Sequence, residues 1–376
     1  MCLPTSLYSL LLVIAASGRL AAAEPALTDN ASCDCFRTNG SIVGFFAQHR
    51  FFDFRNLSQY AGVPDPINDK NESANAFATS DYFLSDQWNN FWEIQSWNNS
   101  GGERSDATIY MGNSPNNIYI EQNTDDKPSS KTWMTLRTMR LPTFQTAAEI
   151  ESVSRDFKFL SVRMLARTVG SPGGCTAMFT YRGRGSSVQE ADVEVRTIDP
   201  PTVVQYTNQP SVNDDGDVIA QATINATLPG GLEWSDWAVH RLDWTPTQST
   251  WYVDGVQSAK ISYQVPRDPS QVILNAWSNG GAWTGNMTKG HAAYMQIQWF
   301  DIVYNSTGDG GGEQKRAADK TSCRRVCSVD DTSRTGTPVL LWNAAPRLGH
   351  STSGLMVWVP YLAGLAMVYM SSGLLA

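Results

Sequence analysis

The central part of the chain, residues 41–304, consists of short runs of β-branched and aromatic residues separated by Gly, Pro, Asn and Asp. Such runs predict strands, and hardly any stretch repeats its apolar residues at helical spacing. The pair Asp254-Gly255 lies between two such runs, which is a strong signal for a β-hairpin. The strands that we expect span residues 108–111, 117–121, 133–137, 159–167, 175–181, 191–196, 238–244, 248–253, 272–277 and 295–304. This number of short strands predicts an all-β fold of two packed antiparallel sheets.

Composition narrows the range of ligands. Of the 376 residues, 41% are hydrophobic, which is enough for a large core, and the formal net charge is −8 without a long basic run. A nucleic acid partner is therefore not expected, because binding a phosphate backbone needs clustered Lys and Arg. Thirteen Trp and thirteen Tyr in a chain rich in Asn and Gly favour a sugar ligand instead, since a sugar ring combines flat apolar faces with hydrogen-bonding groups.

Both ends of the chain carry targeting patterns. Residues 1–23 contain an apolar run and end in Ala21-Ala22-Ala23, which is typical of a secretory signal peptide, and the run is too short to span roughly 30 Å of hydrocarbon. Small residues at 343–345, a polar spacer and an apolar tail predict that residues 346–376 are the propeptide of a glycosylphosphatidylinositol (GPI) anchor. A C-terminal transmembrane helix is the alternative, but positive residues that would hold a cytoplasmic end are absent.

Glycosylation sequons and cysteines agree with secretion. Asn-x-Ser/Thr sequons occur at Asn30, Asn39, Asn56, Asn71, Asn98, Asn225, Asn286 and Asn305. We therefore expect a secreted glycoprotein at the cell surface, anchored by its lipid to the plasma membrane, with the cell wall as a second destination.

Five cysteines remain once Cys2 leaves with the signal peptide. Because Cys33 and Cys35 precede the body while Cys323 and Cys327 follow it, two disulfides could tie the chain ends together, leaving Cys175 as a buried thiol. Zinc is the alternative ligand for these four cysteines, but their spacing fits zinc ribbons poorly. We expect no metal and no cofactor.

The expected organisation follows from these patterns. A Cys-containing lead at residues 24–40 precedes the functional body at 41–305, and a flexible stalk with a Cys pair follows at 306–345, because residues 308–312 are almost all Gly. Residues 62–78, rich in Pro, Asn and Asp, form a long loop, either on the rim of a cleft or without any contact to ligand.

The motif that could carry catalytic chemistry is Glu190-Ala191-Asp192-Val193-Glu194, in which acids alternate with apolar residues. On a strand the three carboxylates share one face. The Cα atoms of Glu190 and Glu194 would lie about 13 Å apart, and their side chains could bring the carboxyls to about 5 Å, the separation that retaining glycosidases need. A solvated strand face and a calcium site are the alternatives.

These residues stand within a wider resemblance. The sequence closely resembles fungal members of glycoside hydrolase family 16 over nearly the whole body. The matching segments are residues 90–97, 144–152, 190–194, 240–246, 251–255 and 274–283.

The resemblance implies a concanavalin A-like jelly roll with a substrate cleft across its concave sheet. It implies that Glu190 is the nucleophile, that Asp192 orients and tunes it, and that Glu194 is the general acid/base. Asn275, Trp277 and Trp283 would bind substrate at the cleft rim, although core packing is the alternative for each Trp. We interpret Trp88, Trp92 and Trp97 mainly as core and His240 as structural.

The resulting hypothesis is a monomeric retaining glycosidase that cleaves β-1,3 or β-1,3-1,4 glucan. A wall transglycosylase acting on glucan or chitin with the same catalytic pair, a glucan-binding lectin without activity and a structural wall mannoprotein are the rivals. Many family members place an aromatic residue in or beside the acid motif where this chain has Val193 and Val195, which leaves substrate preference open.

Overall fold

The computed structural model describes residues 26–101, 106–184, 187–213, 215–307 and 323–343. The signal peptide expected at 1–23 and the anchor propeptide expected at 346–376 lie outside the described residues. No helix in the described ranges is long and apolar enough to cross a membrane. Helices are few and short: α1 (Lys70–Ala74) lies in the expected long loop, and α2 (Asp86–Asn89) contains the core residue Trp88.

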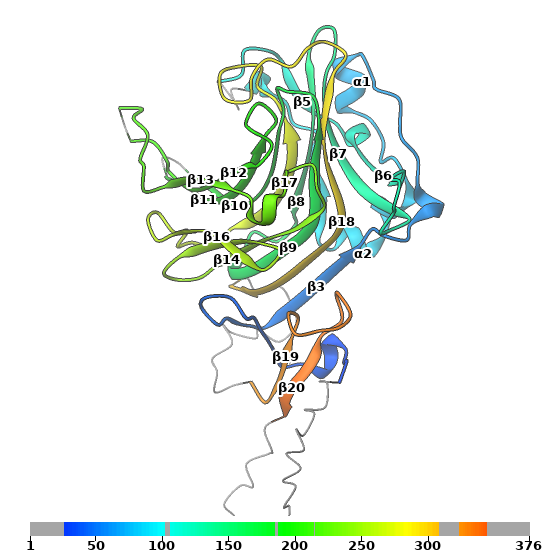
Figure 1. The fold of residues 1–376 in the computed structure, drawn as a ribbon. Helices are drawn as coiled ribbons and strands as arrows, with labels where there is room; N and C mark the ends of the chain where they lie inside the picture. Colours follow the sequence, from blue (N-terminus) through cyan, green and yellow to red (C-terminus); the bar gives the residue numbers. More distant parts are fainter. Residues whose placement is uncertain (1–25, 102–105, 185–186, 214, 308–322, 344–376) are drawn as a thin grey trace, which may run out of the picture. The chain divides into compact units, whose positions relative to one another are not determined.

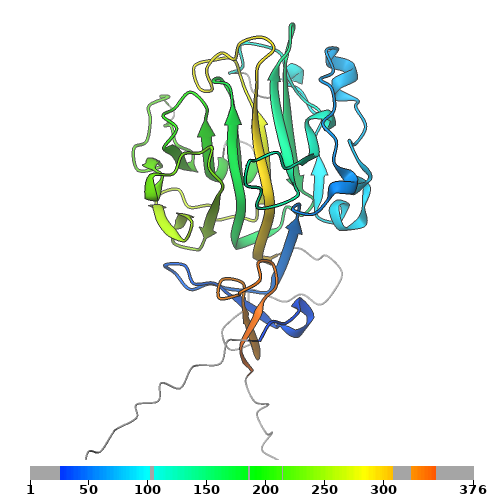
Figure 2. The same cartoon turned by 45° about the vertical axis from the view of Figure 1, so that its right-hand side comes forward.

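The body consists of two sheets, which we name after their central strands (Figures 1 and 2). The β9 sheet has the order β16, β15, β14, β9, β18, β7, β6, and β3 also pairs with β18. Its strands are β3 (Gln48–Asp53), β6 (Ile118–Gln122), β7 (Thr132–Arg140), β9 (Phe157–Gly170), β14 (Ala238–Trp244), β15 (Ser249–Val253), β16 (Val256–Ile261) and β18 (Ala292–Ser306).

The β11 sheet has the order β13, β12, β11, β10, β17, β8, and β4 also pairs with β8. Its strands are β4 (Trp92–Ile94), β8 (Gln145–Ser152), β10 (Cys175–Arg184), β11 (Ser187–Arg196), β12 (Val203–Gln209), β13 (Thr223–Thr227) and β17 (Gln271–Trp277). The two sheets join where β7 pairs with β8, and the short β5 (Met111–Asn113) runs parallel to β8. The predicted all-β, two-sheet fold is confirmed.

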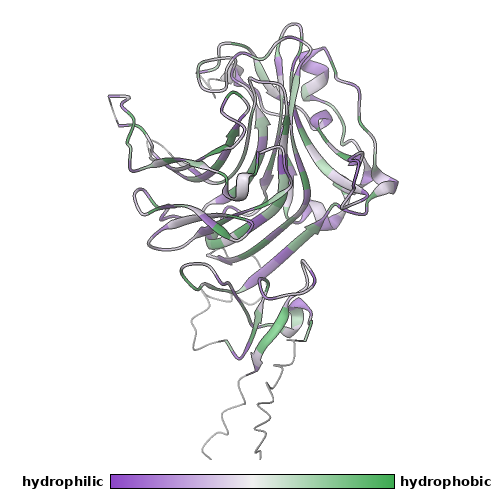
Figure 3. Cartoon of the chain, in the orientation of Figure 1, coloured by the Kyte–Doolittle hydropathy of each residue, from purple (hydrophilic) through white to green (hydrophobic). Residues whose placement is uncertain are grey.

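One large apolar core fills the space between the sheets. Hydrophobic and hydrophilic residues alternate along many strands (Figure 3), as expected for strands buried on one face. Trp88 and Trp92 are fully buried there, as predicted. His240 is also buried, and burial lowers its pKa to about 4, so the ring is neutral near pH 7, in keeping with the structural role expected for it.

The predicted hairpin is present. β15 ends at Val253 and β16 begins at Val256, so Asp254 and Gly255 form the two-residue turn between them. Both turn residues have positive φ, 47° and 78°, which the Asp-Gly pair tolerates because Gly has no Cβ and Asp is among the residues that enter this region most readily.

A small third sheet brings the two ends of the described chain together. It has the order β2 (Phe45–Phe46), β1 (Cys35–Arg37), β19 (Arg325–Ser328), β20 (Val339–Asn343). Disulfides Cys33–Cys327 and Cys35–Cys323 close it, and Cys175 remains a buried thiol, as predicted. We call this unit the terminal clasp. The sequence predicted a flexible stalk at residues 306–345, but in the structure the last part of this segment forms the strands β19 and β20. Residues 308–322 of the segment lie outside the described ranges.

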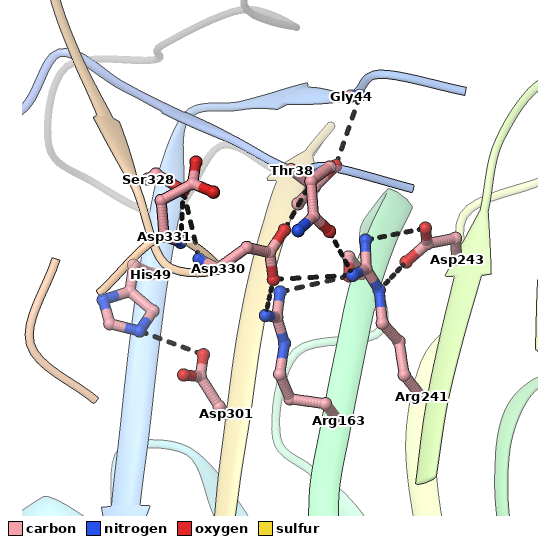
Figure 4. Close-up of polar contacts among 12 residues, drawn as sticks. Thr38, Gly44, His49, Arg163, Arg241, Asp243, Asp301, Ser328, Asp330 and Asp331 are labelled. Carbon is pink, nitrogen blue, oxygen red and sulfur yellow. Dashed lines mark hydrogen bonds and ion pairs between the residues drawn. The ribbon is translucent and has the colours of Figure 1, made fainter. Parts of the chain in front are cut away.

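A buried ionic cluster fixes the terminal clasp to the β9 sheet (Figure 4). Asp330 follows β19 and forms ion pairs with Arg163 on β9 and Arg241 on β14, while Arg241 also binds Asp243 through two hydrogen bonds of 2.7 and 2.8 Å. Burial alone would raise the pKa of Asp330, but the charges of Arg163 and Arg241 hold it below its ordinary value. Asp330 is therefore ionised, as a carboxylate facing two guanidinium groups must be.

Candidate active site

The three acids of β11 share one face of the strand, as predicted. Ala191, Val193 and Val195 are buried in the core between the sheets. Because successive side chains of a strand point to opposite faces, Glu190, Asp192 and Glu194 point away from that core. Glu190 and Glu194 are half-buried, whereas Asp192 is only 3% exposed. We call this outer face of the β11 sheet the acidic face.

The environment of Asp192 favours its protonated form. Burial is the main cause that raises the pKa of Asp192 well above its ordinary value, and the negative charges of Glu190 and Glu194 raise it further. A carboxyl group that keeps its proton can donate a hydrogen bond to a neighbouring carboxylate. The arrangement therefore separates the three acids into a buried central group and two flanking groups that are open to a ligand.

Cross-strand pairing places more polar groups in line with Glu194. Glu194 pairs with Ala177 on β10, Ala177 with Asn275 on β17, and Asn275 with Glu149 on β8. The side-chain amide of Asn275 donates to Oε2 of Glu149 over 3.2 Å. Asn275, expected to bind substrate, thus lies on the acidic face together with Glu149, and the small side chain of Ala177 separates it from Glu194.

Trp97 completes this row and differs from its expected role. Its indole N–H donates to Oε1 of Glu149 over 2.7 Å, and the ring is half-buried, so Trp97 belongs to the site and not to the main core. Glu149 was not singled out in the sequence, although it lies in the alternating segment Glu149-Ile150-Glu151. That alternation, similar to the one on β11, was the signal that could have identified it.

The other two predicted tryptophans lie at the same end of the acidic face. Trp277 packs in a buried apolar cluster with Met111, Ala147 and Cys175, and it is only 6% exposed. Trp283 is half-buried against this cluster, and the guanidinium carbon of Arg196 lies 4.5 Å from the centre of its ring. Trp283 consequently offers more surface to a ligand than Trp277 does.

The opposite end of the acidic face is more polar. Glu190 pairs with Tyr181, and Tyr181 pairs with Gln271, whose amide donates to Oε2 of Glu151 over 3.1 Å. Burial, followed by the charge of Glu190, raises the pKa of Tyr181, so its hydroxyl group keeps its proton. This end thus has hydroxyl, amide and carboxyl groups where the other end has indole rings.

Within the described ranges, no three His, Cys, Asp or Glu side chains are grouped so that they could hold a metal ion. The chemistry that the described residues can perform is proton transfer and nucleophilic attack by carboxyl groups.

The chain is similar in sequence to known β-glucanases. The β-glucanase of Paenibacillus polymyxa is 23% identical over 135 residues, which are 35% of this chain and 54% of that protein. The β-glucanase of Bacillus licheniformis is 26% identical over 131 residues, 34% of this chain and 51% of the relative. The chain thus spans about half the length of the curated relatives it matches. The solved structure of a Bacillus licheniformis β-glucanase has 21% identity and a TM-score of 0.44, covering 57% of this chain and 92% of that one.

The family model described as "Glycosyl hydrolases family 16" matches residues 112–300. This range includes β11, with Glu190, Asp192 and Glu194, and also Glu149 and Asn275. It covers half of the 376 residues. The chain therefore belongs to glycosyl hydrolase family 16.

Proposed function

We propose that the protein is a retaining glycosidase that cleaves β-glucan between glucosyl units, with β-1,3 or β-1,3-1,4 linkages as the substrate class. The observation that carries the proposal is the placement of Glu190 and Glu194 on one face of β11, on either side of the buried Asp192. The names of the relatives, all β-glucanases, support the choice of substrate.

In the first step the carboxylate of Glu190 forms a bond to the anomeric carbon while the glycosidic bond breaks. Glu194 gives its proton to the departing oxygen, so the leaving sugar departs as an alcohol and a glycosyl-enzyme ester remains. In the second step the Glu194 carboxylate takes a proton from water, whose oxygen binds the same carbon while Glu190 leaves. Two inversions at that carbon give net retention of configuration.

Asp192 assists Glu190 in this scheme without touching the sugar. Its raised pKa means that it holds a proton at pH values where an ordinary Asp is ionised. A hydrogen bond from this proton would orient the Glu190 carboxylate and stabilise it as it leaves in the second step. Asp192 is thus a positioning residue in the proposal.

The proposed place of action is the cell surface of a fungus, where the protein works as a GPI-anchored monomer. The disulfides Cys33–Cys327 and Cys35–Cys323 support an oxidising compartment. The resemblance to fungal family members supports the source, and the pattern of residues 343–376 supports the anchor.

The test uses the full-length protein with laminarin, lichenan and end-labelled glucan oligosaccharides. The wild type should yield shorter products, with the new reducing ends in the β configuration by NMR, and Glu190→Gln and Glu194→Gln should each lower kcat/KM by roughly a thousandfold or more. Glu72→Gln, on the exposed surface of α1, is the matched control and should be fully active. Longer labelled products would indicate transglycosylation instead, and binding without any turnover would leave the lectin alternative.

A further inference from the structure

The structure separates the glycosylation sequons into two groups. Asn305 is only 7% exposed; its side chain accepts a hydrogen bond from the backbone of Ala47 and donates one to Phe45, so a glycan there is incompatible with the fold. The side chains of Asn30 and Asn39 are hydrogen-bonded to His49 and Arg241. Six sequon asparagines are exposed, Asn30, Asn39, Asn56, Asn71, Asn225 and Asn286, and of these Asn30 and Asn39 make the hydrogen bonds just named.

Among these, Asn225 lies on the acidic face. It is in β13, where Ile224 and Ala226 pack against the core between the sheets, so Asn225 and Thr227 of the same sequon point outward. Asn225 pairs with Gln205 on β12, and Gln205 pairs with Glu194 on β11. Since neighbouring strands are about 4.8 Å apart, the Cα atoms of Asn225 and Glu194 are about 10 Å apart.

The acidic face carries different kinds of side chain on the two sides of β11. The indole rings of Trp97 and Trp283 and the polar pair Asn275 and Glu149 all lie on the side of β10, β17 and β8. On the side of β12 and β13 the face consists of small polar groups that bind one another, with Gln205 donating to Thr207 over 3.3 Å and Thr207 lying 3.1 Å from Thr223. Among the residues of β12 and β13 that point outward, none is aromatic, and β13 is the last strand of the sheet.

We propose that Asn225 carries an N-linked glycan that stands on the acidic face and closes it at the β13 edge, so that a glucan chain binds across β10, β17 and β8. The inference rests on the proposed function and on passage through the secretory route. In the group transfer, Nδ2 of Asn225 forms a bond to the anomeric carbon of a lipid-pyrophosphate-linked oligosaccharide. The bond from that carbon to the pyrophosphate oxygen breaks, and one amide proton is released.

The first measurement is whether Asn225 carries an N-linked glycan. The full-length protein, produced in a eukaryotic secretory host, is digested and its glycopeptides are identified by mass spectrometry. We expect the glycan at Asn225 and an unmodified Asn305, because only the first side chain is exposed. An unmodified Asn225 in the secreted protein overturns the inference.

The second measurement is the dependence of binding on chain length. Thr227→Ala removes the sequon but keeps Asn225, and Asn56→Gln removes an exposed sequon in the turn after β3, a strand of the β9 sheet, as the matched control. Titration calorimetry with β-1,3-glucan oligosaccharides of increasing length is done in the Glu190→Gln background, so that no substrate is consumed.

Loss of the glycan should raise the affinity for the longest oligosaccharides at least about threefold, while the shortest bind equally well and Asn56→Gln has no effect. Identical affinities with and without the glycan, or no binding in either form, overturn the inference. Glucan that is bound but never cleaved by the protein with intact Glu190 contradicts the proposed function alone, which keeps the two failures apart.

Discussion

The sulfur of Cys175 lies 3.8 Å from Oε1 of Glu194, across the boundary between β10 and β11. The thiol donates a weak hydrogen bond to this carboxyl group while its other side packs against Trp277 in the buried cluster. One buried thiol thus connects the carboxyl group proposed as acid/base with the aromatic end of the acidic face.

From this contact we expect Cys175→Ala to lower kcat/KM by about two- to tenfold, because Glu194 loses a donor that helps to fix its orientation. Cys175→Ser keeps a donor and should retain more activity than Cys175→Ala, although a hydroxyl in an apolar cluster lowers stability. Steady-state kinetics and the Tm of both variants measure this. Equal activity of the two variants would show that the thiol only fills space.

Asp192 makes stability depend on pH. The pKa of Asp192 in the folded protein is raised above its ordinary value of 3.8. At pH values between the ordinary pKa and the raised pKa, unfolding releases a proton, so the free energy of unfolding falls as the pH rises. The Asp192→Asn variant has no group to ionise at this position. The Tm of the variant minus that of the wild type should therefore increase from pH 4 upward, as thermal scans across pH 4 to 8 can measure. A difference that is the same at every pH argues against a raised pKa.

Trp97→Phe should affect substrate binding more than chemistry. The change removes the indole donor to Glu149, a side chain that is 7% exposed and lies on β8, three strands from Glu194. We expect KM to rise about three- to tenfold with a smaller change in kcat, since the reacting atoms are elsewhere. Trp237→Phe removes a comparable bond to Asp125 and serves as the control. A large fall in kcat with an unchanged KM would contradict this assignment.

The two disulfides of the terminal clasp should act as one cross-link. Each closes a loop of about three quarters of the chain, with separations of 294 and 288 residues. While one remains, the other closes only a few additional residues, so replacing one pair by Ser should cost about 2–3 kcal/mol, whereas replacing both should cost about 8 kcal/mol, more than the sum of the two single costs. Urea titrations of the three variants test this. Strictly additive costs would show that native contacts, and not loop closure, determine the stabilisation.

The face that each residue of β11 presents could be predicted from the sequence because strand periodicity is local. The same holds for the hairpin at Asp254-Gly255, which depends on two adjacent residues. By contrast, Trp97, Glu149 and Asn275 come together only through the order of β8, β17 and β10, and Trp97 is 52 residues from Glu149. No local pattern contains that order.

The structure of the terminal clasp, too, could be predicted only in part from the sequence. The positions of Cys33, Cys35, Cys323 and Cys327 predicted that the ends of the body meet, but they left the pairing and the strands open. β19 and β20 are short, and they are stabilised by partners more than 280 residues away, such as the parallel pairing of Cys35 with Val326. A segment of this kind has the composition of a linker and becomes a strand only because of its partners.

The terminal clasp also determines how the protein bears mechanical load. A force applied at Asn343 enters through β20 and β19 and crosses the disulfides into the amino-terminal segment, which continues into β3. The other covalent route leads back along the chain to β18, and β3 and β18 are neighbours in the β9 sheet. Both routes thus deliver tension to the sheet opposite the acids, so β11 can hold its carboxyl groups in place while the chain end is pulled.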